Sequence, residues 1–307
     1  MPMRNAAQAA CVSHAFLRSW RCHPNLTFHG TTWRFSSKVD HILKNHSGIG
    51  VKKLVINMYG YYAANDSCYL NSWLLTAVTP GIEELLLVLP MRATYNFPCS
   101  LLSNGSGDSI RYLKLGGCSL RPTAELPWLK SLTKVQLNAV SFTGDELGCL
   151  LCNSPALEWL VIRNCDEIVC LKIPCMLRRL RHLEMANTPM LHSKFLHLKK
   201  LSLALSARTF TPSYDYFSLV SFLDACPSLE TLVLDVAQEE MEHVSVFTDP
   251  SDLRKMRGHQ HHKMKQVKIL GFTSAKSQDV RSATAASCGG AVALLAHKGI
   301  NKGGTLG

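Results

Sequence analysis

Residues Ile110–Leu120 read I-R-Y-L-K-L-G-G-C-S-L, a short alternation of leucines followed by two glycines and a cysteine. Leu113 and Leu115 stand two positions apart, so in an extended strand their side chains point to one face and the residues between them to the other. Cys118 stands where the chain turns inward after the strand, where a small apolar side chain fits. One such unit cannot bury its own apolar face, so the stretch predicts a repeat that is covered by its neighbours.

The same pattern, L-x-x-L-x-L, occurs nine times with every apolar position filled. The runs begin at Val51, Ile82, Ile110, Leu132, Leu157, Leu180, Leu198, Leu229 and Met264. Their middle positions are 18 to 35 residues apart, and most separations lie in or near the period of leucine-rich repeats. The connectors Gly144–Cys152 and Leu219–Ala225 predict helices that end shortly before a proline, which prevents their continuation. The sequence therefore predicts an α/β leucine-rich-repeat solenoid, with a parallel sheet on the concave face and helices or irregular segments on the convex face.

The net charge of +11 is concentrated at the two ends of the chain. Residues 1–50 carry +5 and residues 251–307 carry +8, whereas residues 51–250 carry −2. A groove that follows a nucleic acid needs positive charge along the repeat surface, so this distribution argues against a nucleic-acid partner. No stretch approaches the roughly 18 uninterrupted apolar residues of a membrane span. We therefore expect no membrane partner, and a protein as the binding partner.

Twelve cysteines and the absence of a secretory segment favour a reducing compartment, cytoplasmic or nuclear. Cys149 and Cys152 have redox spacing but lie in the middle of a predicted helix among leucines, so we interpret them as structural. His259, His261 and His262 have no accompanying carboxylate or cysteine cluster and predict a solvated basic loop. Nucleophile, phosphate-binding and dinucleotide motifs are absent. The sequence predicts no catalytic residue, no cofactor and no metal site.

Two connectors carry a resemblance to a known family. Leu150–Ile162 and Leu223–Leu234 are similar to the C-P-x-L-E-x-L-x-L repeats of plant F-box/LRR proteins. Met1–Phe28 resembles the second half of an F-box, so the F-box is expected to be N-terminally truncated, and His259–Ser277 resembles the last strand of an FBD-like C-terminal end. The resemblance implies a partial F-box at 1–28, a linker or first cap at 29–50 and about nine repeats at 51–275. A Gly/Ala/Ser-rich tail at 276–307 is expected to be disordered and divergent.

The resemblance implies the substrate-recognition subunit of an SCF-type E3 ubiquitin ligase, with an Skp-type adaptor and a cullin complex as partners. Other subunits would perform the ligase chemistry, so the chain itself would not be an enzyme. The matching half of the F-box places the adaptor contact at Pro2, Met3, Ala10, Val12 and Trp20. An alternative for the last three is a helix that packs on the first repeat.

The target would bind the outward-facing positions of the strands. Neighbouring rungs of a sheet lie about 4.8 Å apart, so Tyr112, Lys134, Trp159 and His182 are expected to form one patch with the aromatic and charged composition of a binding hot spot. The predicted target-binding residues are Tyr112, Lys114, Lys134, Gln136, Trp159, His182 and Glu184. The alternative is that these side chains only cover the sheet or pack under a loop.

Two other functions remain open from the sequence. The chain could be a truncated leucine-rich-repeat module that binds a protein without any link to a ligase. It could also be an organelle-targeted protein, because Met1–Arg21 contains arginine and alanine and the first acidic residue is Asp40.

Overall fold

The computed structural model divides the chain into two compact units, Met1–Leu157 (unit 1) and Glu158–Gly307 (unit 2), and each is described by itself. In unit 1 the structure describes residues 3–30, 35–47, 49–59, 66–91, 94–103, 105–123 and 126–157. In unit 2 it describes residues 158–165, 177–187, 195–206, 225–237 and 262–270. The predicted tail at 276–307 lies outside these residues.

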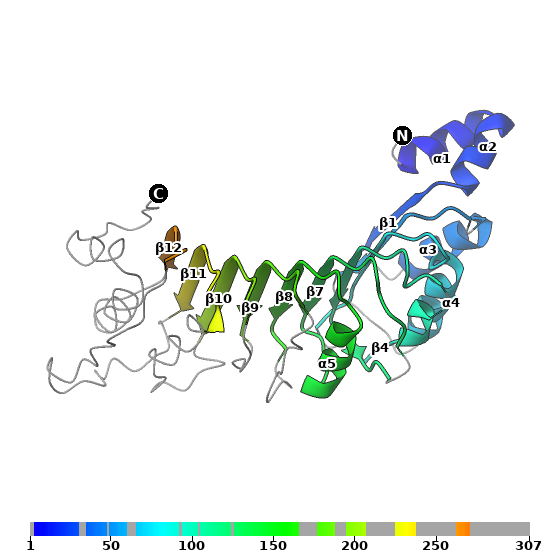
Figure 1. Cartoon of the computed structure of the whole chain (residues 1–307). Coiled ribbons are helices and arrows are strands. Elements are labelled where there is room, and N and C mark those ends of the chain that lie inside the picture. The colour runs from blue at the N-terminus through cyan, green and yellow to red at the C-terminus, as the bar shows by residue number, and fades with distance from the viewer. Residues whose placement is uncertain are drawn as a thin grey trace, which may run out of the picture. The chain divides into compact units, whose positions relative to one another are not determined.

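Five parallel strands form the main sheet of unit 1 (Figure 1). The register is constant from strand to strand, so that Leu54, Leu85, Leu113 and Val135 are successive partners. All four are fully buried, and burying a side chain of this size contributes roughly 1.5–3 kcal/mol. A small second sheet pairs β4 (Asn96–Phe97) with β6 (Ser119–Leu120). The strands of the main sheet are β1 (Asn25–Gly30), β2 (Lys53–Met58), β3 (Glu84–Val88), β5 (Tyr112–Gly116) and β7 (Lys134–Asn138).

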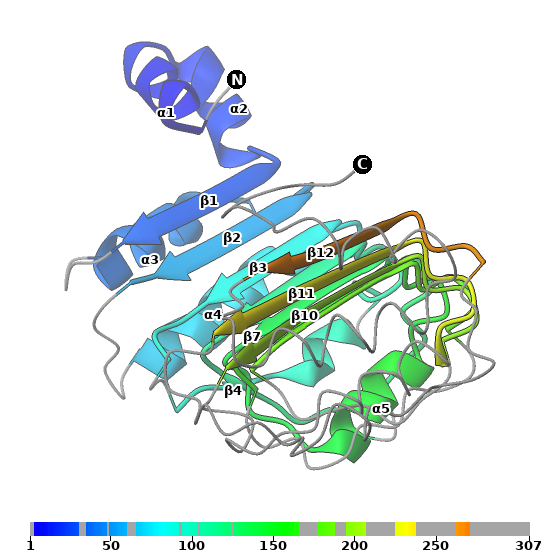
Figure 2. The same cartoon turned by 90° about the vertical axis from the view of Figure 1, so that its left-hand side faces the viewer.

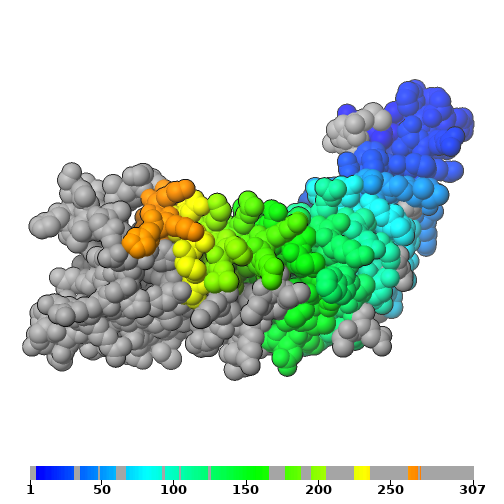
Figure 3. All heavy atoms as spheres, viewed as in Figure 1, coloured from blue at the N-terminus to red at the C-terminus, as the bar shows by residue number. Residues whose placement is uncertain are grey.

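Unit 2 is built in the same way, with five parallel strands. Its described residues run from green through yellow to orange in the space-filling view (Figure 3). Its register is also constant, with His182, Lys200, Thr231 and Gln266 as successive partners. The strands are β8 (Trp159–Arg163), β9 (His182–Ala186), β10 (Lys200–Ser206), β11 (Thr231–Ala237) and β12 (Gln266–Leu270). Each of the nine predicted runs therefore coincides with a strand, which confirms the leucine-rich-repeat fold.

The helices α3, α4 and α5 of unit 1 lie on one side of its sheet (Figure 2). The predicted helix Gly144–Cys152 is confirmed as α5, and its first turn is closed by a capping box in which Thr143 and Glu146 exchange hydrogen bonds. The predicted helix Leu219–Ala225 lies outside the described residues except for Ala225. The helical elements are α1 (Met3–Val12), α2 (His14–Arg21), α3 (Phe35–Asn45), α4 (Asp66–Ala77), the 3-10 helix η1 (Cys99–Leu102) and α5 (Gly144–Cys152).

The sheet begins one strand before the nine runs. Residues 25–30, expected to end the partial F-box and begin the linker, form β1, which pairs with β2 along its whole length. The helix α3 then connects these two strands, as a convex-side element does in a repeat. Leu26 and Phe28 are buried and alternate with exposed residues directly after Pro24. This alternation was the sequence signal that could have predicted β1.

The chain leaves several strands through a left-handed residue at the same repeat position: Gly117 after β5, Ala139 after β7, Asn164 after β8 and Asn187 after β9. A β-carbon on Gly117 would lie 2.3 Å from the carbonyl oxygen of Leu89, so glycine is required there. In unit 2, Asn187 Nδ2 donates to Asn164 Oδ1 at 2.8 Å. Asparagine tolerates this backbone region better than most residues, and the amide pair ties the two turns together.

Buried small residues close the repeats where the sequence predicts them. Cys118 and Cys165 are both buried after their strands.

On the helical side of the unit 1 core, Phe35 of α3 and Trp73 of α4 meet edge to face with ring centroids 6.3 Å apart. Among the described residues, no helix combines the length and apolarity needed to cross a membrane.

Candidate functional site

We define the open face of each sheet as the side opposite the buried leucine columns. In unit 1 it carries Lys53, Glu84, Tyr112 and Lys134 in one column, and their side chains are half-buried. Alternation along the strand produces this arrangement, because the residues before and after each middle leucine must point away from the core.

The predicted residues of unit 1 contact one another on the open face. The Tyr112 hydroxyl donates to Gln136 Oε1 at 2.6 Å, and Lys134 Nζ lies 4.8 Å from the centroid of the Tyr112 ring, within cation–π range. Burial and the nearby Glu84 raise the pKa of Tyr112, so the phenol stays protonated and can donate. Lys114 is half-buried in the same column as Gln136. The structure therefore brings Tyr112, Lys134 and Gln136 together as a set of mutual contacts.

The open face of unit 2 has a different construction, centred on an exposed indole. Trp159 is 39% exposed, and its ring lies over that of His182, its partner on β9, with centroids 3.9 Å apart and planes inclined by 31°. His182 is only 6% exposed. The sequence predicted His182 as a surface member of the patch, but the large indole covers it. His182 therefore supports Trp159 from beneath.

An ion pair between Arg163 and Glu184 lies farther along the open face of unit 2. Arg163 Nε donates to Glu184 Oε1 at 2.7 Å, and the Arg163 Nη2 atom bonds to the same oxygen. The other carboxylate oxygen of Glu184 lies 3.9 Å from His182 Nε2. Arg163 was missed by the sequence analysis, although it stands two outward steps beyond Trp159 on the same strand. The sequence analysis considered only the first two outward-facing positions of each strand, which on β8 are Trp159 and Val161. Arg163 is the third outward-facing position of that strand.

Not every outward position is available to a partner. Val55 and Val161 stand in the second outward column of the pattern, and both are buried. Apolar side chains at outward positions lower their free energy by covering one another. Tyr112 lies in unit 1 and Trp159 in unit 2. The expectation that their two groups form one patch therefore stays a prediction.

The predicted adaptor contact falls on the helix pair at the start of the chain. α1 and α2 pack on each other, Ala6 is buried, and Ser13 caps α2 by accepting from the Ala15 amide at 3.3 Å. Val12 is 87% exposed, which excludes for Val12 the alternative of packing on the first repeat. Ala10 and Trp20 are half-buried. Of the others, Met3 begins α1 and Pro2 lies outside the described residues.

Phe16 was not predicted as part of this surface, yet it is 49% exposed on α2. No residue of α2 is buried. Phe16 on α2 and Val12 on α1 are thus both exposed apolar side chains of this helical pair.

The cysteine pair of α5 does not have the properties of a redox site. Cys149 is half-buried, its thiol lies 3.2 Å from the carbonyl oxygen of Thr123, and burial together with Cys152 raises its pKa. A catalytic thiol needs the opposite shift. Across the described part of the chain, no group of three or more histidine, cysteine, aspartate or glutamate side chains could hold a metal ion. His262 is exposed, and His259 and His261 lie outside the described residues.

Comparison with known proteins supports the repeat architecture. The family model described as At1g61320/AtMIF1, LRR domain, matches residues 42–186 and 182–278, more than half of the chain. A comparison with curated proteins returns no match. Arrays of this kind present extended binding surfaces, which suggests a protein-interaction module. The chain belongs to the At1g61320/AtMIF1 leucine-rich-repeat domain family.

Proposed function

We propose that this protein captures a target protein on the open face of its leucine-rich repeats as the substrate-recognition subunit of an SCF-type E3 ubiquitin ligase. The α1–α2 pair would bind an Skp-type adaptor, and the cullin complex would supply the ligase chemistry. The chain itself would perform no catalysis and would act in the cytoplasm or nucleus.

The observation that supports target capture most strongly is the exposed ring of Trp159. Tryptophan is enriched at the centres of protein interfaces because one side chain buries a large area at a low cost in conformational entropy. Here the ring is stacked on His182, and the ion pair of Arg163 and Glu184 lies farther along the same two strands. A partner therefore meets an indole whose position is already fixed, which reduces the entropy lost on binding.

The adaptor half of the proposal is supported by the exposed apolar side chains of the first two helices. Val12 on α1 and Phe16 on α2 are both apolar and exposed. The test is a pull-down of the full chain with a purified Skp-type adaptor. The double substitution Val12→Glu/Phe16→Glu should abolish retention, while Leu75→Glu, at an exposed position of α4, should leave it unchanged.

A second candidate is a leucine-rich-repeat protein that binds its target without any link to a ligase. The observation in its favour is that the family match begins at residue 42 and leaves α1 and α2 unmatched. The same pull-down separates the two candidates, because a chain without adaptor affinity would retain target binding through Trp159 but would recover no adaptor. Organelle import, the remaining alternative from the sequence, predicts a fluorescent fusion that concentrates in organelles.

A further inference from the structure

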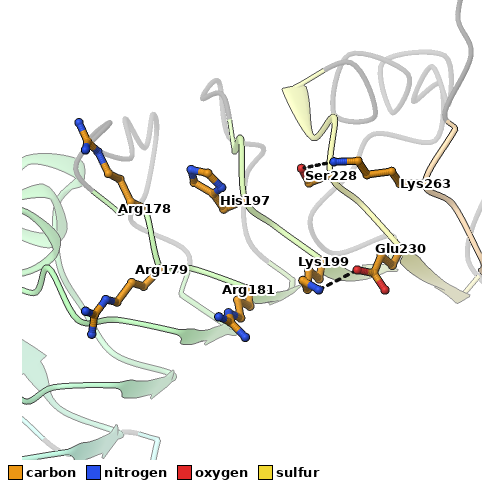
Figure 4. A pocket seen from close by; sticks show the side chains of 8 residues that line it. All are labelled: Arg178, Arg179, Arg181, His197, Lys199, Ser228, Glu230 and Lys263. Atoms are coloured by element: carbon orange, nitrogen blue, oxygen red, sulfur yellow. Dashed lines mark hydrogen bonds and ion pairs between the residues drawn. The ribbon is translucent and has the colours of Figure 1, made fainter.

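A cavity of about 390 Å³ lies at the edge of unit 2 where the strands β9 to β12 begin (Figure 4). It is separate from the open face, because its residues belong to the turns that precede the strands. We call it the cationic edge. It is lined by Arg178, Arg179, Arg181, His197, Lys199, Ser228, Glu230 and Lys263.

One repeated turn builds this edge. The amides of Leu180, Leu198 and Leu229 each donate to the carbonyl three residues earlier, so the same turn precedes β9, β10 and β11. Backbone bonds then link neighbouring rungs: Lys199 N donates to Arg181 O, and Glu230 N donates to Lys199 O, both close to 2.9 Å. The side chains at equivalent positions are therefore held about 4.8 Å apart, the spacing of a sheet.

Positive charge is in excess on this edge. We counted the charged residues that directly precede each strand or lie in the turn before it, within the described part of unit 2. The two carboxylates are Glu158 and Glu230, and the net charge is +4. The six cationic side chains are those of Arg178, Arg179, Arg181, Lys199, Lys263 and Lys265. Arg178, Arg179 and Arg181 are exposed and make no ion pair with any described residue. Like charges held this close repel one another unless an anion lies between them.

The corresponding edge of unit 1 is nearly balanced. There Lys52 pairs with Glu83 at 3.1 Å, and Lys130 faces Asp108 at 3.9 Å. The excess at the start of β9 to β12 is therefore a property of this one region and does not follow from the repeat itself.

Glu230 shows how the edge holds a carboxylate. Its two oxygens receive Lys199 Nζ at 2.8 Å and Lys265 Nζ at 2.7 Å. These lysines lower the pKa of Glu230 to about 2, so it stays ionised over the physiological range. One carboxylate is thus bound by the lysines of its two neighbouring rungs. Arg178, Arg179 and Arg181, which all lie in the turn before β9, make no ion pair with any described residue.

We propose that the cationic edge binds an extended, carboxylate-rich segment of a partner protein. Arginine forks match carboxylates with two parallel hydrogen bonds. The four rungs from β9 to β12 span about 14 Å at sheet spacing, which corresponds to about four residues of an extended chain. An acidic segment that runs along these rungs could therefore place carboxylates against the three arginines before β9 and against Lys263 before β12, in the pattern that Glu230 already shows.

A nucleic acid fits this edge less well. None of the lining residues is a phenylalanine, tyrosine or tryptophan on which a base could stack. Glu230 and Glu158 also stand within or beside the row of cations and would repel a continuous phosphate backbone. The cationic edge does not include Trp159, so its test is independent of the test of target capture on the open face.

The test is fluorescence anisotropy of the full chain with a labelled peptide of about ten residues that alternates aspartate or glutamate with glycine or serine. The wild-type chain should bind this peptide, should ignore its asparagine/glutamine counterpart, and should lose affinity about 10-fold when salt rises from about 50 to about 500 mM. Arg178→Ala/Arg179→Ala/Arg181→Ala should weaken binding at least about 10-fold. Circular dichroism checks that the triple variant is folded.

Matched controls locate the effect. Arg111→Ala/Lys130→Ala removes cations from the same edge positions of unit 1 and should leave peptide affinity unchanged, as should Trp159→Ala. Equal affinity of a folded triple variant and wild type would overturn the proposal. Tighter binding of an oligouridylate of similar length, or binding of a phosphoserine peptide when the carboxylate peptide fails to bind, would also overturn it.

Discussion

The two open faces are made from the same repeat but use their aromatic residues in different ways. In unit 1 the hydroxyl of Tyr112 bonds to Gln136 and its ring is contacted by Lys134, so the polar groups of this set satisfy one another. In unit 2 the ring of Trp159 rests on His182 and leaves more than a third of its surface exposed. The comparison teaches that an aromatic residue at the same repeat position stabilises the sheet in one case and is available to a partner in the other.

The largest expected effect is on target binding. Trp159→Ala should weaken binding of the target about 30-fold, which corresponds to about 2 kcal/mol for a hot-spot residue. The variant should remain folded, with a loss of stability no larger than that of His182→Ala, because both remove the same stacked pair. Tyr112→Ala should change affinity less than about 3-fold. Affinity can be measured by interferometry once the target is captured. A larger loss with Tyr112→Ala than with Trp159→Ala would reverse the comparison.

The next effect is on the support beneath the indole. His182→Ala should destabilise the protein by roughly 1 kcal/mol, because it removes a buried ring that stacks on Trp159. Urea unfolding followed by tryptophan fluorescence measures this change. His182→Phe retains an aromatic ring and should recover most of the loss. A full loss with phenylalanine would mean that the contact with Glu184, rather than stacking, stabilises this position.

In unit 1 the expected effect is smaller. Tyr112→Phe removes the hydroxyl that donates to Gln136 and should cost about 0.5–1 kcal/mol in free energy of unfolding, since the bond is half-buried. The double variant with Gln136→Leu should recover part of this loss, because it removes the unpaired acceptor. If Tyr112→Phe is neutral, the open face of unit 1 has no stabilising polar contact at this residue.

The smallest effect is the acid dependence of the cationic edge. The folded pKa of Glu230, about 2, lies below its usual 4.5, so its contribution is present above about pH 4.5 and is lost as the pH falls towards 2. Glu230→Gln should therefore reduce the loss of stability over this range at low salt. Glu158→Gln, which makes no ion pair with a described residue, is the control. Parallel acid profiles for Glu230→Gln and wild type would contradict the assignment.

Sequence reasoning predicted the repeats well because leucine periodicity reports directly on burial. Every run from Val51 to Met264 coincides with a strand, and Cys118 and Cys165 are buried where the turn requires small side chains. It missed β1, because the alternation of Leu26 and Phe28 is shorter than the pattern of the runs. The family model independently supports the leucine-rich repeats.

The site was less predictable because it depends on side-chain size and on neighbours across strands. Periodicity places Trp159 and His182 on the same face, but only the three-dimensional contact decides which ring covers the other. The cationic edge was hidden for a related reason. The net charge of −2 over residues 51–250 averages the carboxylates of the whole segment against arginines that gather in the turns before a few strands.

The central claim is that a target protein binds the open face of unit 2 at Trp159. The most direct measurement replaces Trp159 with a photo-crosslinking phenylalanine derivative in cells and compares the adducts with those from the same replacement at Trp128, which is also exposed. The account predicts a discrete protein adduct from position 159 that is absent from position 128. Identical adducts from both positions, or no adduct from 159, would contradict it.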